Sequence, residues 1–200
     1  MRRYALRHTP YALRSTPDAG RWMHRAICVL LPAFCILLGS CSQKYIGHSV
    51  IDPGFDTRRT YSVAIMPLLV RGPLVTPGSF ERDRAYGFLL RRLMETGKLR
   101  PMDRPTVERA VGLQEYGQQG AVSPAKAREI GRELGAQLVC LAEVSIERDS
   151  VISATVDVLD VGTTTTVYSG TARSANPVSA IAAAEYALEQ ATEKLVRTMK

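Results

Sequence analysis

The sequence predicts an α/β protein, a single-domain α/β sandwich built on a mixed sheet. A continuous apolar run at 61–69 is typical of a strand buried on both faces. Segments with helical periodicity follow it, and 137–172 then shows three consecutive strand patterns. With a last helix, the expected order is β-α-β-α-α-β-β-β-α. Helices must then cover a sheet that is parallel near the front and antiparallel behind.

The first strand should end at Pro67, because proline has no amide to donate to the ladder. A turn-rich stretch follows at 71–78. Ser79 can cap the first helix, and Gly97 can end it in a left-handed conformation. The apolar stripe of this helix is Tyr86, Leu89, Leu90 and Leu93.

Two further helices are expected after a weak short strand at 99–102. Asp103 can cap the second helix, with Pro105 in its first turn. After a loop at 117–120, Ser123 and Pro124 open the third helix, which Gly135 stops. The residues expected to face inward are Val107, Ala110, Val111, Ala127, Ile130 and Leu134.

The second half reads as an antiparallel meander followed by a long helix. The strands are expected at 137–146, 151–159 and 164–172, with turns at 148–150 and 160–162. Asn176 and Pro177 cap the last helix, in which Glu193 and Arg197 can pair. Its inward stripe is Ile181, Ala184, Leu188, Ala191, Leu195 and Met199.

Net charge gives a misleading first impression. The chain has a formal charge of +7, but residues 1–40 hold six arginines and one acid. The remainder has 20 basic and 18 acidic residues and is about neutral. The charge therefore favours neither nucleic acid nor a polyanionic substrate as partner.

The N-terminal region indicates a bacterial lipoprotein signal peptide. A 13-residue apolar run at 26–38 follows Arg25, which is short for a membrane span of ~20 residues and typical of a signal core. Leu38-Gly39-Ser40-Cys41 then resembles the bacterial lipobox, in which the cysteine thiol carries the lipid. The alternative is an uncleaved anchor with an incidental cysteine.

The predicted domains are a signal peptide at 1–40, a lipidated tether at 41–60 and a periplasmic α/β domain at 61–200. Met23 is an alternative start, which would give a more compact signal. Acylated lipoproteins carry several chains, and more than one chain gives stable anchoring. Ser42 after the cysteine points to the outer membrane under the sorting rule of enteric bacteria, with the domain facing the periplasm.

Little in the mature chain suggests catalysis. Its one histidine, His48, lies in the expected tether. The expected domain therefore has no histidine for a catalytic triad or a zinc cluster. Cys140 is expected to be a buried small hydrophobe. Glu143, Asp157 and Asp160 could form a paired-carboxylate site, but strand-surface and turn positions are the simpler interpretation. We therefore expect no enzyme activity, no metal and no cofactor.

A series of short phrases resembles the domain shared by curli-secretion lipoproteins and the lipoprotein activators of penicillin-binding proteins. They are Val63-Ala64-Ile65-Met66-Pro67, Leu99-Arg100-Pro101-Met102-Asp103-Arg104, the segment 127–139 and the hairpin ending Asp157-Val158-Leu159-Asp160-Val161-Gly162. The resemblance covers about 61–199. Gln137 and the lack of threonine before Gly162 depart from it.

The resemblance implies a fold rather than a site, with Gly131 allowing close helix packing. It suggests a non-enzymatic lipoprotein that activates or assembles an envelope machine, such as a penicillin-binding protein. The alternative is a structural ring or accessory subunit of an outer-membrane secretion, export or flagellar apparatus, possibly a homo-oligomer. No spare amphipathic hairpin is present for a self-made pore.

Overall fold

The computed structural model describes residues 46–72, 80–112, 122–146, 151–175 and 180–200. They form a mixed sheet with helices on both faces, which confirms the predicted fold class. The strand order across the sheet is β1-β7-β6-β5-β2-β4. β3 also pairs with β5, further along that strand than β2 does. The elements are β1 (Ile46–Ile51), β2 (Tyr61–Ile65), β3 (Leu69–Arg71), α2 (Phe80–Met94), β4 (Leu99–Pro101), α3 (Arg104–Val111), α5 (Pro124–Glu133), β5 (Leu138–Ile146), β6 (Val151–Asp160), β7 (Thr166–Ala175) and α6 (Ala180–Met199).

The sheet is parallel on one side and antiparallel on the other, as the sequence predicted. β2 runs parallel to both β4 and β5, and β3 is also parallel to β5. The ladder from β5 through β6 and β7 to β1 is antiparallel throughout. The predicted meander of three long strands is therefore present, with one further strand added at its edge.

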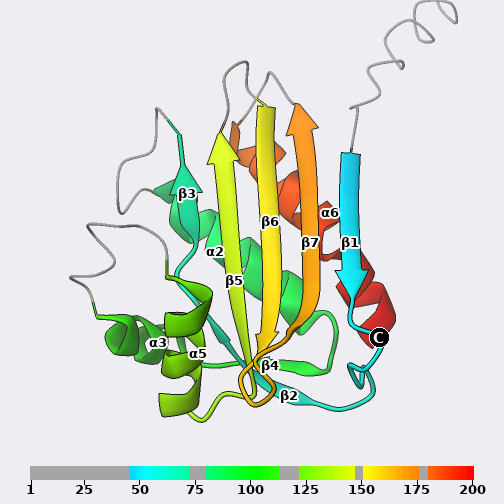
Figure 1. Ribbon diagram of the computed structural model, residues 1–200. Helices are drawn as coiled ribbons and strands as arrows, with labels where there is room; N and C mark the ends of the chain where they lie inside the picture. Colours follow the sequence, from blue (N-terminus) through cyan, green and yellow to red (C-terminus); the bar gives the residue numbers. More distant parts are fainter. Residues whose placement is uncertain (1–45, 73–79, 113–121, 147–150, 176–179) are drawn as a thin grey trace, which may run out of the picture. The chain divides into compact units, whose positions relative to one another are not determined.

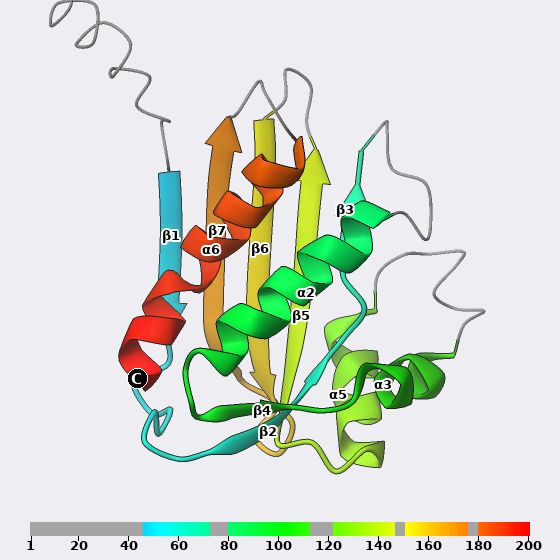
Figure 2. The same cartoon turned by 180° about the vertical axis from the view of Figure 1, so that it is seen from behind.

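Two apolar clusters lie on opposite faces of the sheet. Helices α2 and α6 cover one face, where the larger cluster includes Leu89, Leu93, Leu188 and Leu195 (Figure 2). Helices α3 and α5 lie on the other face and cover only part of it (Figure 1). Their smaller cluster packs Val107, Val111, Ala127 and Ile130 against strand residues such as Val139.

Most of the expected inward residues are buried. On β6, Ile152, Ala154, Val156 and Val158 all face the larger cluster, as their alternation predicted. Ala110 is only partly buried against the smaller cluster. Ile181 is likewise intermediate, whereas the rest of the α6 stripe is buried.

Two helix caps match the local sequence signals. The side chain of Asp103 accepts a hydrogen bond from the amide of Thr106, and that of Ser123 accepts one from the amide of Lys126. Gly135 has a φ of 69° just after α5, so the expected glycine stop is confirmed. The predicted caps at Ser79 and at Asn176–Pro177, and the segments 117–120 and 148–150, lie outside the described residues.

The close packing expected at Gly131 is also confirmed. A Cβ atom there would lie 2.4 Å from Cγ2 of Val139 and 3.0 Å from Cγ2 of Val161. Real Cβ contacts are not that short, so α5 can approach the sheet this closely only with glycine at this position.

The expectation of a tether over 41–60 is wrong for residues 46–60. Ile46–Ile51 is a strand of the sheet, antiparallel to β7 along its whole length. The chain then turns, with the amide of Asp52 bonded to the carbonyl of Val167 and the Phe55 ring stacked on Tyr61. The segment is polar because an edge strand is paired through its backbone and needs little apolar surface.

The first strand ends before Pro67, as predicted, but the apolar run 61–69 continues into a second strand, β3, that was not predicted. The amide of Met66 still donates to Cys140, but Pro67 has no amide and interrupts the ladder. Pairing resumes at Leu69, where β3 continues along β5 and ends at Arg71, the first residue of the predicted turn-rich stretch.

Candidate functional site

The predicted lipid-attachment residue, Cys41, and the lipobox residues Leu38, Gly39 and Ser40 all lie outside the described residues. The first described strand after these residues is β1. Because β1 starts at Ile46, only residues 42–45 separate Cys41 from the sheet. The expected lipid anchor would therefore be followed by a short connection to a folded domain.

Cys140 is the one cysteine among the described residues, and it is buried in the larger apolar cluster. Burial, with a smaller contribution from Asp157, raises the pKa of its thiol to about 12. A thiol of this kind is neutral at physiological pH and inaccessible, so it is not a nucleophile. The expectation of a buried small hydrophobe is confirmed.

The three acids considered as a carboxylate site do not converge. Glu143 on β5 forms an ion pair with Arg71 on β3, with 2.9 Å between Oε1 and Nε. Asp157 on β6 stands opposite Leu141 in the ladder. Asp160 accepts a bond of 2.6 Å from the amide of Thr163 and so forms the predicted turn.

A groove lies on the open face of the sheet beside the start of α5. Its volume is about 340 Å³. Four segments line it: the β2–β3 connection, the beginning of α5, and the middle of β5 and of β6. The lining residues are Pro67, Leu69, Val122, Ser123, Pro124, Leu141, Ala142, Glu143, Thr155 and Asp157.

The groove combines apolar and acidic groups. Leu69 and Leu141 offer partly exposed apolar side chains, and Asp157 and Glu143 place two carboxylates beside them. Such a lining suits a basic side chain that is adjacent to an apolar one on a partner protein. The groove could not be predicted from the sequence, because the segments that line it are distant from one another in the chain. The apolar residues Leu69 on β3 and Leu141 on β5, which face outward, were the only hint of it in the sequence.

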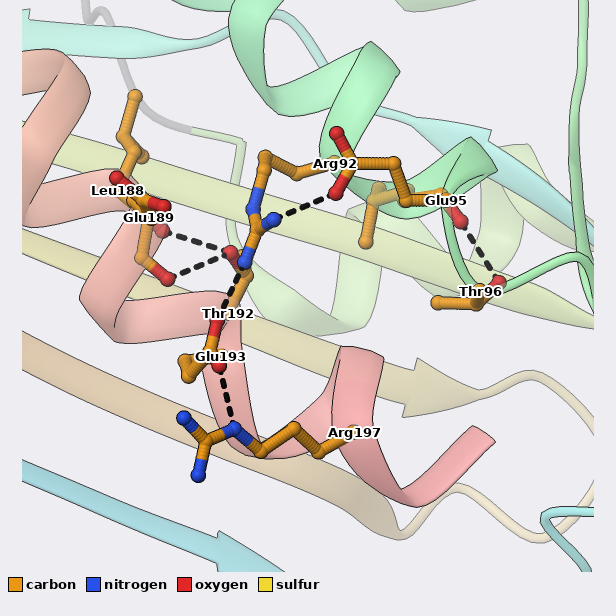
Figure 3. A network of polar contacts seen from close by, with 9 residues as sticks. Arg92, Glu95, Thr96, Leu188, Glu189, Thr192, Glu193 and Arg197 are labelled. Carbon is orange, nitrogen blue, oxygen red and sulfur yellow. Dashed lines mark hydrogen bonds and ion pairs between the residues drawn. The ribbon is translucent and has the colours of Figure 1, made fainter. Parts of the chain in front are cut away.

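Three of the basic residues at 82–104 form ion pairs with acidic residues. Arg84 pairs with Glu185 of α6, and Arg104 pairs with Asp83 and Glu108. Arg92 bonds to Glu95 at 2.5 Å and to Glu193 of α6 at 2.6 Å (Figure 3). The pairs with Glu185 and Glu193 tie α2 to α6, and the pair of Arg104 with Asp83 ties α3 to α2.

Among the residues that the structure describes, no group of three or more histidine, cysteine or acidic residues could hold a metal ion. In the same residues, no helix has both the length and the apolar character needed to cross a membrane.

Comparisons with known proteins gave structural neighbours only. The sequence matches no protein-family model, and no curated protein is similar to it. Similar solved structures include the PelC dodecamer from Paraburkholderia phytofirmans, which is 16% identical with a TM-score of 0.46 and covers 76% of this chain and 96% of its own. The LpoB C-terminal domain from Escherichia coli is 19% identical with a TM-score of 0.47, and the match covers 62% of this chain and 88% of that domain. Lipoprotein GNA1162 from Neisseria meningitidis is 18% identical with a TM-score of 0.45, over 59% of this chain and 82% of its own.

Proposed function

We propose that this protein is a lipid-anchored periplasmic protein of the outer membrane that binds a protein partner. It would activate or assemble a cell-envelope machine, such as a penicillin-binding protein. The observation that carries the proposal is the lipobox-like Leu38-Gly39-Ser40-Cys41, which stands five residues before the first strand of the domain. The phrases that resemble the lipoprotein activators supply the class of partner.

The surroundings of the cysteine thiol and of the acidic side chains support a binding function rather than catalysis. The thiol of Cys140 is buried, and Glu143 is paired with Arg71. Asp160 holds a turn through its side chain. The thiol and the Asp160 carboxylate therefore have structural roles, and the exposed charges of the sheet remain for contact with a partner.

The groove beside α5 is the proposed contact for the partner. Asp157 is the test position because its carboxylate lines the groove and has a short side chain on a long central strand. A partner segment with a lysine or arginine next to an apolar residue would place its cation near Asp157 and its apolar group against Leu141.

The anchor is tested by metabolic labelling of the full chain with palmitate. The wild type and the control Cys140→Ala should both be labelled and processed to the mature length, because Cys140 takes no part in acylation. Cys41→Ala should lose the label and keep its signal sequence. Labelling that persists in Cys41→Ala would disprove the assignment of the anchor.

The partner is tested with a purified penicillin-binding protein, by measuring its glycan polymerisation rate and its crosslinking to this protein. Asp157→Lys should lose both effects, whereas Glu133→Lys, the same charge reversal on the exposed end of α5, should retain them. If the wild type neither crosslinks nor alters the rate, a penicillin-binding protein is not the partner. Light scattering of residues 43–200 then addresses the alternative, since a defined ring would favour a structural subunit.

A further inference from the structure

The place where β1 joins the sheet limits how the domain can lie on a membrane. Cys41 precedes Ile46 by five residues, and a fully extended chain spans at most ~3.6 Å per residue. Even at full extension, the start of β1 cannot be more than ~18 Å from the lipidated cysteine. This limit depends only on the number of residues.

The sheet is longer than this reach. β6 has ten residues from Val151 to Asp160, and a strand rises ~3.3 Å per residue, so its ends are ~30 Å apart. β1 is antiparallel to β7 and β7 to β6, so the start of β1 lies at the same end of the sheet as the start of β6. The end that holds Asp160 therefore cannot be turned to the membrane while Cys41 stays in the bilayer.

The register of the ladder defines a cross-strand row at the anchored end of the sheet. In this row Ile46 stands opposite Arg173, Arg173 opposite Ser153, Ser153 opposite Ser145, and Ser145 opposite Arg71. Their alternation with buried neighbours such as Ile152 and Val144 places Arg71 and Arg173 on the open face. We call these five positions the anchored row.

The charge of the anchored row fits a surface of anionic lipid. It holds two exposed arginines, on β3 and β7, and no acidic residue. Glu143 lies two residues further along β5, in the next row on the same face, and pairs with Arg71. At the far end, by contrast, Arg132 and Glu133 are adjacent and both exposed. Basic residues close to a bilayer are attracted to acidic headgroups within about a Debye length.

We propose that the anchored row lies against the lipid headgroups, with Arg71 and Arg173 contacting anionic lipid and the Asp160 end of the sheet facing away. This inference rests on the proposed lipid anchor at Cys41. It adds an orientation and a second contact with the membrane that the anchor alone does not specify. The groove is then only one or two side-chain rows from the bilayer, because Glu143 and Thr155 form the next row.

The test measures the distance of two labelled sites from a bilayer. The lipidated mature protein, in a Cys140→Ala background, is labelled at Ser153→Cys in the anchored row or at Glu133→Cys at the far end. Each is reconstituted into vesicles of phosphatidylethanolamine and phosphatidylglycerol that contain an acceptor lipid dye. Energy transfer should be several-fold stronger from position 153 than from 133.

Equal transfer from the two sites, or stronger transfer from position 133, would overturn the proposed orientation. A protein that carries no lipid on Cys41 would instead overturn the proposed function and this inference together. Mass spectrometry of the purified protein distinguishes that outcome before any vesicle is prepared.

The role of the arginines is tested by a pair of double variants. Arg71→Gln with Arg173→Gln should reduce the difference between the two sites in vesicles that contain phosphatidylglycerol. Arg58→Gln with Arg132→Gln removes the same charge from exposed positions outside the row and should leave the difference unchanged. If the difference in energy transfer between positions 153 and 133 is unchanged in Arg71→Gln with Arg173→Gln, the contact with anionic lipid is overturned. If the control variant reduces that difference equally, the effect is one of general charge and the specific contact is likewise overturned.

Discussion

Arg92 of α2 and Glu193 of α6 are 101 residues apart in the sequence and form an ion pair at 2.6 Å. The Arg92 side chain is only 11% exposed, and its other terminal nitrogen bonds to Glu95. Glu193 in turn bonds to Arg197 one turn further along α6 (Figure 3). The two helices that cover one face of the sheet are therefore joined by a polar link above their apolar contact.

Removing the carboxylate of Glu193 should destabilise the domain. Glu193→Gln leaves the nearly buried guanidinium of Arg92 with one acidic partner, and we expect a loss of about 1–2 kcal/mol in the free energy of unfolding. Urea unfolding followed by circular dichroism measures it. Glu189→Gln, one turn earlier on α6, is the control and should change little. An equal loss in both variants would contradict the role of the link.

The contribution of Glu193 should depend on pH. The hydrogen bond from Arg197 lowers its pKa, burial opposes this, and Arg92 lowers it further. Because the folded-state pKa lies below the unfolded value, the stabilisation is present above the unfolded pKa and is lost as pH falls through the folded one. The difference in unfolding free energy between wild type and Glu193→Gln should therefore shrink from pH 7 to pH 3. A constant difference would contradict the lowered pKa.

Two glycines in helices should respond oppositely to alanine. Gly131→Ala places a Cβ against Val139 and Val161, and overpacking of this kind costs about 1–3 kcal/mol. Gly87→Ala on α2 has no atom within 4 Å of the new Cβ and should gain up to about 1 kcal/mol from helix propensity. Thermal unfolding of both variants measures the contrast, which fails if both shift the same way.

The thiol of Cys140 should be unreactive in the folded protein. It is fully buried and its pKa is about 12, so a thiol reagent at pH 8 should modify residues 43–200 only after unfolding. Labelling with and without guanidinium chloride, followed by mass spectrometry, tests this. Rapid modification under native conditions would mean that β5 is exposed.

Removing β1 should damage the domain, although its sequence looks like a linker. A protein that begins at Pro53 loses the ladder to β7 and exposes that strand's edge, so we expect a lower melting temperature and aggregation. A protein that begins at Gln43 keeps the ladder and serves as the reference. Equal melting temperatures would restore the original expectation of a tether.

The sequence predicts best what neighbouring residues determine. The caps at Asp103 and Ser123, the stop at Gly135 and the alternation along β6 depend on local geometry, and each is confirmed. β1 and β3 depend on pairing with distant strands, which no local pattern of apolar residues encodes. The groove was not predicted for the same reason, since it exists only once α5 lies beside β5 and β6.

The pairing of β1 with β7 also sets an order on folding. β1 is the first of the described strands to be synthesised, yet its partner spans Thr166–Ala175, so more than a hundred residues separate the two. Contacts of such long range form late, because the intervening chain must first be brought together. A chain made or moved across a membrane from its N-terminus cannot close this sheet until nearly all of it has emerged. The N-terminal edge of the sheet is therefore the part that is completed last.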